Sequence, residues 1–197
     1  MKRFLLALLI PSAFMAVSGP DALAQSKEKK LYPTHLDDLK LLYHVSSDGR
    51  AENLGELGFG MAIIPLQIEE YRKLGVTKDD LKVSIVIHGN AAYWLLNQDA
   101  WTRITPTLED LQRKRRKLGV PLPEKNPNIE LVKELQELGV SVEICGDMMQ
   151  IRGWTNDDLL PGVTPVLSAP HRVLDLQREG YAYIRFASVG SHLNEYT

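Results

Sequence analysis

The sequence predicts an α/β protein in which a four- to five-stranded, mainly parallel sheet is flanked by helices in three layers. Four short segments are rich in Val, Ile and Leu with little polar alternation, as in strands covered on both faces, and helical periodicity follows most of them. Strands that alternate with helices favour parallel pairing through right-handed crossovers. The expected strands are residues 39–49, 81–90, 140–146 and 163–169, with YAYIRF at 181–186 as a fifth.

Three helical segments are expected to connect these strands. The first is apolar at helical spacing and contains Pro65, which should kink or interrupt it. The second follows Asn128, a favourable N-cap residue. Each segment ends at a glycine, the residue type that most often follows a helix. The segments are residues 54–75, 128–139 and 169–180.

The beginning of the chain, MKRFLLALLIPSAFMAVSGPDALA, has the three parts of a secretory signal peptide. Lys2 and Arg3 give a positive start, an apolar stretch follows, and ALA forms a small-residue cleavage site that ends at Ala24. The apolar stretch is short for a membrane span and is interrupted by a proline, so cleavage after Ala24 and a periplasmic or secreted location are expected. The predicted organisation is a signal peptide at 1–24, a flexible leader at 25–35 and a single α/β domain at 36–197.

The composition restricts the partners and the redox chemistry. The chain has a formal net charge of −2, which gives no reason to expect nucleic acid or an anionic membrane as a partner. No later apolar run is long enough to span a bilayer, so no stable membrane insertion is expected after signal cleavage. The single cysteine excludes an intramolecular disulfide. Its thiol is therefore buried and inert, bound to a metal, or reactive toward an external group.

Unusual residues cluster where the predicted strands end. At the carboxyl ends of parallel strands, loops and helix N-termini converge and ligand sites form. One edge is therefore expected to collect three histidines and the only thiol. Each residue also has a structural interpretation as a turn, a helix cap or a core histidine, but their clustering favours a site. The candidate residues are His44, His88, Asn90, Cys145, Asp147 and His171.

Cys145 ends the third predicted strand, and the following GDMMQIRG is able to start a helix. Amides at a helix N-terminus favour a thiolate, whereas Asp147 opposes it through like charge and a protonated His88 or His171 would assist it. Free cysteine is also among the most buried residue types and often behaves as a small hydrophobic residue. The residues alone leave both interpretations open.

Several motifs together resemble one family. Cys145 is followed after six residues by Arg152 and Gly153, and then by PGVTPVLSA and a closing helix. With VSIVIHGNAAYWLL (83–96) and GVTPVLSAPHRVLDLQREGYAYI (162–184), this pattern resembles the DsrE/DsrF-like family of sulfur-handling proteins. The resemblance extends over roughly residues 39–184 and implies a compact α/β domain with a parallel sheet, often assembled as a trimer or hexamer.

The resemblance also implies a function. In the sulfur-relay members of the family, one cysteine at the end of the third strand accepts sulfane sulfur as a persulfide and passes it to a partner. Cys145 matches that cysteine, and the chain would then be an exported sulfurtransferase or sulfur carrier whose partners are a sulfur donor, acceptor thiols or proteins, and further copies of itself. We expect His88 or His171 to assist Cys145 as a base or to hold the anion, and His88 is assigned the catalytic role with Cys145. The predicted substrate-binding residues are His44, Asn90, Asp147 and His171, and no cofactor is expected.

Two other functions compete with sulfur relay. A non-catalytic ligand-binding or assembly module would keep the fold with a structural cysteine. A periplasmic copper-binding protein would use Cys145 and a methionine, because soft sulfur ligands suit Cu(I). Met148 and Met149 are adjacent and would point in different directions on a helix, so at most one would join Cys145 and at least one is expected in the core. The sequence contains no recognised metal-ligand spacing, and no metal is expected.

Overall fold

The structure is a computed structural model that describes residues 35–46, 59–117, 119 and 122–187. Its centre is a five-stranded sheet in the order β4-β3-β2-β1-β5, and every neighbouring pair is parallel. The predicted α/β fold with a mainly parallel sheet is therefore confirmed. The predicted signal peptide and nearly all of the leader lie outside the described residues. The strands are β1 (Leu39–Ser46), β2 (Leu81–His88), β3 (Ser141–Cys145), β4 (Thr164–Val166) and β5 (Ala182–Ala187).

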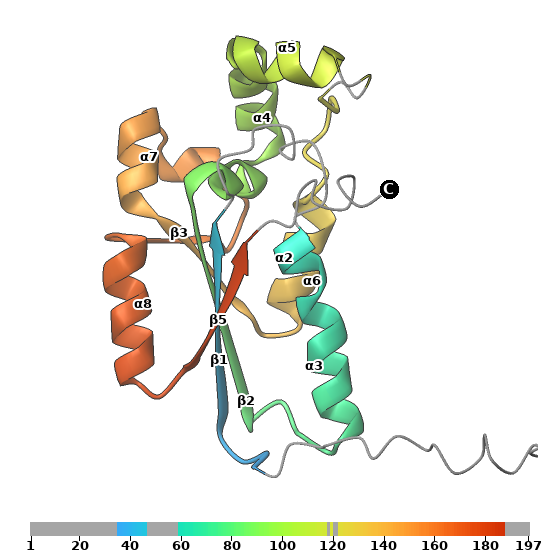
Figure 1. Ribbon diagram of the computed structural model, residues 1–197, viewed down its shortest axis with the longest axis vertical. Coiled ribbons are helices and arrows are strands. Elements are labelled where there is room, and N and C mark those ends of the chain that lie inside the picture. Colours follow the sequence, from blue (N-terminus) through green and yellow to red (C-terminus); the bar gives the residue numbers. More distant parts are fainter. Residues whose placement is uncertain (1–34, 47–58, 118, 120–121, 188–197) are drawn as a thin grey trace, which may run out of the picture. The chain divides into compact units, whose positions relative to one another are not determined.

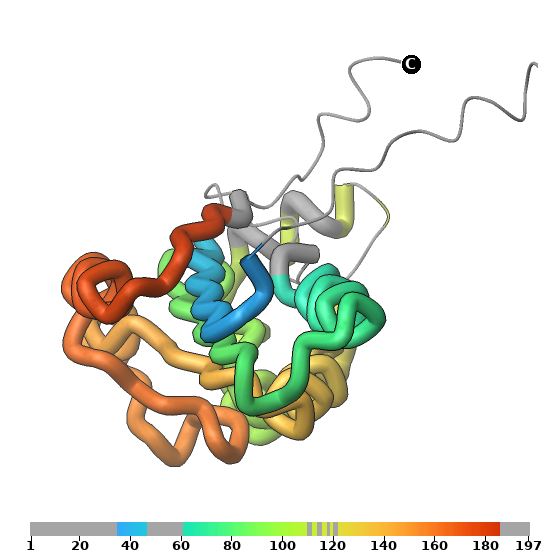
Figure 2. The backbone as a smooth tube through the Cα atoms, turned by 90° about the horizontal axis from the view of Figure 1, so that it is seen from below, coloured from blue at the N-terminus to red at the C-terminus, as the bar shows by residue number. Residues whose placement is uncertain are grey.

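Helices cover both faces of the sheet. Figures 1 and 2 show α8 on one face and α3 and α6 on the other, which gives the three predicted layers. In the part of the chain that the structure describes, no helix is long and apolar enough to cross a membrane. The helices are α2 (Phe59–Ala62), α3 (Ile64–Lys73), α4 (Gln98–Ile104), α5 (Glu109–Lys117), α6 (Ile129–Glu137), α7 (Gly146–Arg152) and α8 (Ala169–Arg178), with shorter 3₁₀ turns η2 (Gly89–Leu95), η3 (Thr105–Thr107) and η4 (Asn156–Asp158).

Two apolar clusters fill the space between the sheet and its helices. Successive residues of a strand point to opposite faces, so Leu42 belongs to one cluster and Tyr43 to the other. Burial on both faces explains the continuous apolar runs in the sequence. The larger cluster, on the α3 and α6 side, includes Tyr43, Ile85, Ile144, Ile64 and Leu135. The smaller cluster, on the α8 side, contains Leu42, Val86, Cys145, Ala169 and Leu176.

Some element boundaries differ from the prediction. The first strand ends at Ser46, and residues 47–49 lie outside the described residues. Residues 54–58 of the helix predicted over 54–75 lie outside the described residues, and the rest is divided into α2 and α3. Pro65 lies in the first turn of α3, where a missing N–H costs no helical hydrogen bond. The fourth strand is shorter than predicted because the chain leaves the sheet after Val166.

The predicted helix ends are correct, but the side chain of the predicted N-cap residue, Asn128, does not cap its helix. Gly75, Gly139 and Gly180 all have positive φ, as expected after helices. Asn128 occupies the N-cap position of α6 without a side-chain capping hydrogen bond. Ser168 likewise precedes α8 without capping it, because its hydroxyl is hydrogen-bonded to a histidine ring instead.

Candidate functional site

The thiol of Cys145 lies at the carboxyl edge of the sheet. Cys145 ends β3 and occupies the N-cap position of α7. Its Sγ accepts a hydrogen bond from the backbone N–H of Ala169, the first residue of α8, over 3.3 Å. Amides at helix starts carry partial positive charge and are good hydrogen-bond donors, and one of them points at this sulfur atom. Cys145 is nevertheless buried, with only 4% of its surface exposed.

A short segment at the edge of the sheet runs beside this thiol. Cys145 pairs with Val166 of β4, an edge strand of three residues, and Leu167 after it is 80% exposed. The approach of the two backbones is close, because a Cβ atom on Gly146 would lie 2.5 Å from the carbonyl oxygen of Val166 and 3.0 Å from that of Leu167. Glycine is therefore required at position 146 for this packing.

A buried ion pair holds α8 against β3. Glu143 is 3% exposed, and its carboxylate accepts hydrogen bonds from Nε and Nη2 of Arg172 over 2.8 and 2.9 Å. The hydroxyls of Ser84 and Ser141 donate to the same carboxylate over 3.3 and 3.2 Å. Arg172 lies in the turn of α8 that begins at Ala169, so the ion pair also positions the amide that contacts the thiol.

Two of the three predicted histidines lie together. The rings of His44 and His88 are stacked with centroids 4.7 Å apart, and Nδ1 of His44 is hydrogen-bonded to the hydroxyl of Tyr183 over 2.7 Å. The strand register pairs Ile87 with Ile144, so His88 and Cys145 occupy the next positions on neighbouring strands. The side chains of His88 and Cys145 both lie on the α8 side of the sheet. Cys145 and Val86 belong to the same apolar cluster, and His88 is two residues after Val86 and therefore on the same face of β2.

The surroundings of this histidine pair keep both rings neutral. Burial lowers the pKa of His44 to about 4, with further contributions from His88 and Arg185. Burial followed by the charge of Arg185 also lowers the pKa of His88. Nε2 of each ring is buried, and among the described residues it has no hydrogen-bond partner. Near neutral pH both imidazoles are therefore proton acceptors rather than cations.

The other candidates lie elsewhere on the carboxyl side of the sheet. His171 is exposed, its Nδ1 lies 2.5 Å from Oγ of Ser168, and no described contact joins it to the histidine pair. It faces away because Ala169, Val173 and Leu176 form the apolar stripe of α8 that contacts the sheet. Asn90 accepts a hydrogen bond from Nη2 of Arg152 over 3.0 Å, and Asp147 is exposed in the first turn of α7.

Sequence reasoning did not identify four residues beside these candidates. Tyr183 and Arg185 come from β5, whose sequence AYIRFA alternates apolar and polar residues and so indicates one polar face. The position of Glu143 within an apolar strand also indicates a residue that contacts it, because a buried carboxylate requires a partner. That partner, Arg172, is identified only by the packing of α8 on β3.

Among the described residues, no group of three or more His, Cys, Asp or Glu side chains is arranged to hold a metal ion. Met148 packs against the cluster that contains Cys145, whereas Met149 belongs to the larger cluster on the other side. The prediction that the two methionines point in different directions is confirmed.

The fold and the site together define a parallel α/β protein with one cysteine at the carboxyl edge of its sheet. The model of the DsrE/DsrF-like family matches residues 40–186, and the chain belongs to this family. No curated protein matches the chain.

Two solved structures are similar to this chain. One is a protein of unknown function, MTH1491, from Methanobacterium thermoautotrophicum, with 21% identity, a TM-score of 0.47 and coverage of 76% of this chain and 100% of that one. The other is the ychN protein from E. coli, with 13% identity, a TM-score of 0.46 and coverage of 75% of this chain and 100% of that one.

Proposed function

We propose that this protein is an exported sulfur carrier, which receives sulfane sulfur as a persulfide on Cys145 and passes it to an acceptor thiol. One observation carries the proposal: the only cysteine ends β3, and its Sγ accepts a hydrogen bond from the first amide of α8. Amide donors at a helix start favour a thiolate or a persulfide anion over the neutral form. Membership of the DsrE/DsrF-like family supports the proposal, because its relay members carry their cysteine at the end of this strand.

The chemistry needs one thiol and no redox cofactor. The Cys145 thiolate attacks the outer sulfur atom of a donor persulfide, and a new S–S bond forms as the S–S bond of the donor breaks. The donor leaves as a thiolate, and the proton stays on the outer sulfur atom, which Cys145 now holds. An acceptor thiolate then attacks that outer sulfur atom and releases Cys145 as a thiolate. Sulfane sulfur moves between thiols, and the two exchanges together involve no net oxidation.

His88 is the proposed proton acceptor for the thiol. His88 follows Ile87 in β2, and Cys145 follows Ile144 in β3. Because Ile87 pairs with Ile144, the backbones of His88 and Cys145 lie side by side on neighbouring strands, about 5 Å apart. Burial and the charge of Arg185 lower the pKa of His88, so the ring is neutral and has a nitrogen free for the thiol proton, but the same lowering makes it a weaker base than an ordinary histidine. His44 supports this ring by stacking against it, and Tyr183 in turn fixes His44.

Sulfur transfer requires the covered thiol to become accessible. The segment that runs beside Cys145 consists of a short edge strand and the exposed Leu167, which makes it the part of the site with the least packing to lose. We propose that Val166 and Leu167 move away when a donor or an acceptor binds, while the buried Ala169 keeps its amide beside the thiol. Asp147 and His171 are exposed at the starts of the two adjacent helices, where they would contact that partner.

Export and assembly belong to the same proposal. The signal-like residues 1–24 support export to the periplasm or secretion, and the family resemblance supports a homo-oligomer. The N-terminal sequence of the exported protein should begin at Gln25, and light scattering should give a trimer or a hexamer. An N-terminus that still contains residues 1–24 would contradict export with cleavage, and a monomeric mass would contradict the homo-oligomer.

The reactivity of Cys145 tests the central claim. The purified protein is incubated with sodium tetrasulfide, and its intact mass is recorded before and after treatment with dithiothreitol. The expected product carries added sulfur that the reductant removes, and Cys145→Ser should acquire none. His88→Gln should slow alkylation of the thiol by iodoacetamide near neutral pH, whereas His35→Gln, at an exposed histidine outside the site, serves as a matched histidine control. A thiol that reacts only after unfolding would identify the protein as a binding or assembly module with a structural cysteine.

A further inference from the structure

A separate pocket lies at the C-terminal end of α7, with a volume of about 310 Å³. Its walls come from η2, from α4 and the turn after it, and from the residues that follow α7. Two arginines, two aromatic rings and two aliphatic side chains dominate the lining. They are Arg103, Arg152, Tyr93, Trp154, Ile104 and Leu108.

Among the described residues, Arg152 has neutral partners only. Its guanidinium carbon lies 4.3 Å from the ring centroid of Tyr93 and 5.7 Å from that of Trp154, and these two rings meet edge to face at 4.9 Å. Nη1 donates to the hydroxyl of Tyr93, and Nη2 donates to the side-chain oxygen of Asn90. Within the described part of the chain, no carboxylate pairs with this guanidinium.

A cation in this position is incompletely satisfied. A guanidinium has five N–H groups, of which these contacts engage two, and the Nε atom of Arg152 is buried without a partner among the described residues. Stacking on aromatic rings stabilises a cation, but it does not replace a counterion in a partly buried site. The pocket therefore has a fixed positive charge that is available to an anion.

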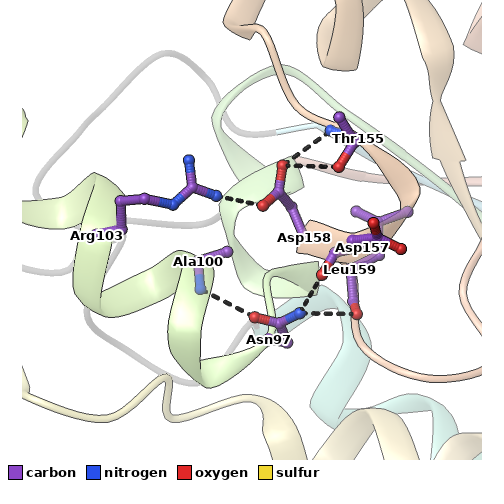
Figure 3. Close-up of polar contacts among 7 residues, drawn as sticks. All are labelled: Asn97, Ala100, Arg103, Thr155, Asp157, Asp158 and Leu159. Atoms are coloured by element: carbon purple, nitrogen blue, oxygen red, sulfur yellow. Dashed lines mark hydrogen bonds and ion pairs between the residues drawn. The ribbon is translucent and has the colours of Figure 1, made fainter.

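Arg103 differs because its charge is already neutralised. Its guanidinium contacts Asp158, whose carboxylate also accepts hydrogen bonds from the backbone N–H of Thr155 over 2.8 Å and from its hydroxyl over 3.4 Å (Figure 3). The side chain of Asn97 caps α4 through Ala100 and donates to two backbone carbonyls next to Asp158 (Figure 3). These contacts tie α4 to the segment after α7, so the pocket is formed before any ligand binds.

We propose that this pocket binds a small organic monocarboxylate, with Arg152 facing the carboxylate and with Ile104 and Leu108 against the apolar part. A single unneutralised guanidinium matches one negative charge, and its planar fork suits a carboxylate. The volume of about 310 Å³ corresponds to roughly ten groups the size of a water molecule, which suits a small ligand.

This site is independent of the proposed sulfur chemistry. Arg152 lies seven positions after Cys145, about 10 Å farther along the axis of α7. Tyr93 and Trp154 also belong to the larger apolar cluster, whereas Cys145 belongs to the smaller one. Binding at this pocket should therefore be the same in Cys145→Ser as in the natural sequence.

Calorimetric titration with benzoate tests the proposal, and benzyl alcohol serves as the uncharged probe of similar shape. We expect benzoate to bind more tightly than benzyl alcohol and to bind more weakly as salt is added. It should also change the tryptophan fluorescence of the protein, because Trp154 lines the pocket. Arg152→Met should weaken benzoate binding about tenfold to a hundredfold, because charge-assisted hydrogen bonds are lost. Arg178→Met, which removes an exposed guanidinium from the last turn of α8, should change nothing.

A second variant keeps the test decisive if Arg152→Met does not fold. Arg103→Gln leaves the Asp158 charge unneutralised near the pocket and should weaken benzoate binding roughly fivefold through repulsion. The proposal is overturned if benzoate does not bind the natural sequence. It is also overturned if benzyl alcohol binds equally well, or if neither arginine variant changes the affinity for benzoate.

Discussion

Replacing Arg172 with methionine should destabilise the protein and uncover its thiol at the same time. Arg172 donates two hydrogen bonds to Glu143, and the same turn of α8 supplies the Ala169 amide that contacts Cys145. Methionine keeps much of the apolar stem of arginine and removes the charge, so the variant isolates the ion pair from packing. Loss of the pair leaves a buried carboxylate with two serine hydroxyls and no cation.

The structure sets the expected magnitude. Breaking a buried ion pair by removing one partner costs about 3–5 kcal/mol. Here the side chain of Glu143 is 4% exposed but that of Arg172 is 31% exposed, so solvent already screens one end of the pair. The serine hydroxyls also continue to satisfy part of the carboxylate. We therefore expect the free energy of unfolding to fall by about 2–3 kcal/mol in Arg172→Met.

Urea denaturation of four proteins tests this reasoning: the natural sequence, Arg172→Met, Glu143→Gln and the double variant. Because both single changes break the same contact, the double variant should lose less stability than the sum, with a coupling free energy of about 1–2 kcal/mol. The rate at which iodoacetamide alkylates Cys145 in native buffer should rise in Arg172→Met. Additive stability changes together with an unchanged alkylation rate would refute the assignment of Arg172 to holding α8 over the thiol.

Two further predictions concern the same edge of the sheet. Gly146→Ala should lower the free energy of unfolding by about 1–3 kcal/mol, since its Cβ would lie 2.5 Å from a backbone oxygen. Gly153→Ala is the control: its Cβ would meet no atom within 4 Å, so it should cost only the strain of positive φ, about 1 kcal/mol. Equal denaturation midpoints for the natural sequence and Gly146→Ala would contradict the close approach. Stability should also fall as pH drops from 6.5 toward about 4, because His44 is protonated in that window in the unfolded chain but not in the folded one. After allowance for solvent screening, the free energy of unfolding should fall by about 1–2 kcal/mol over this pH range. If His44→Gln shows the same pH dependence as the natural sequence, another group is responsible.

Local patterns in the sequence were sufficient for most of the elements. Continuous apolar runs identified β1, β2 and β3, because strands buried on both faces need apolar side chains at nearly every position. The end of β4 was not predictable, since Leu167 is as apolar as a core residue and yet is 80% exposed. Its exposure follows from the turn into α8, which is decided by packing and not by residue type.

For the site, the sequence by itself determined which residues with reactive side chains lie at the strand ends, because alternation of strands and helices encodes parallel direction. Only the tertiary structure decided which of them meet. His44 meets His88 because β1 and β2 are neighbours, and it meets Tyr183 because β5 adds to the far side of β1. The cover over Cys145 depends in the same way on where β4 and α8 pack. Strand order and helix docking arise from contacts between residues far apart in the chain, and no local window of sequence contains that information.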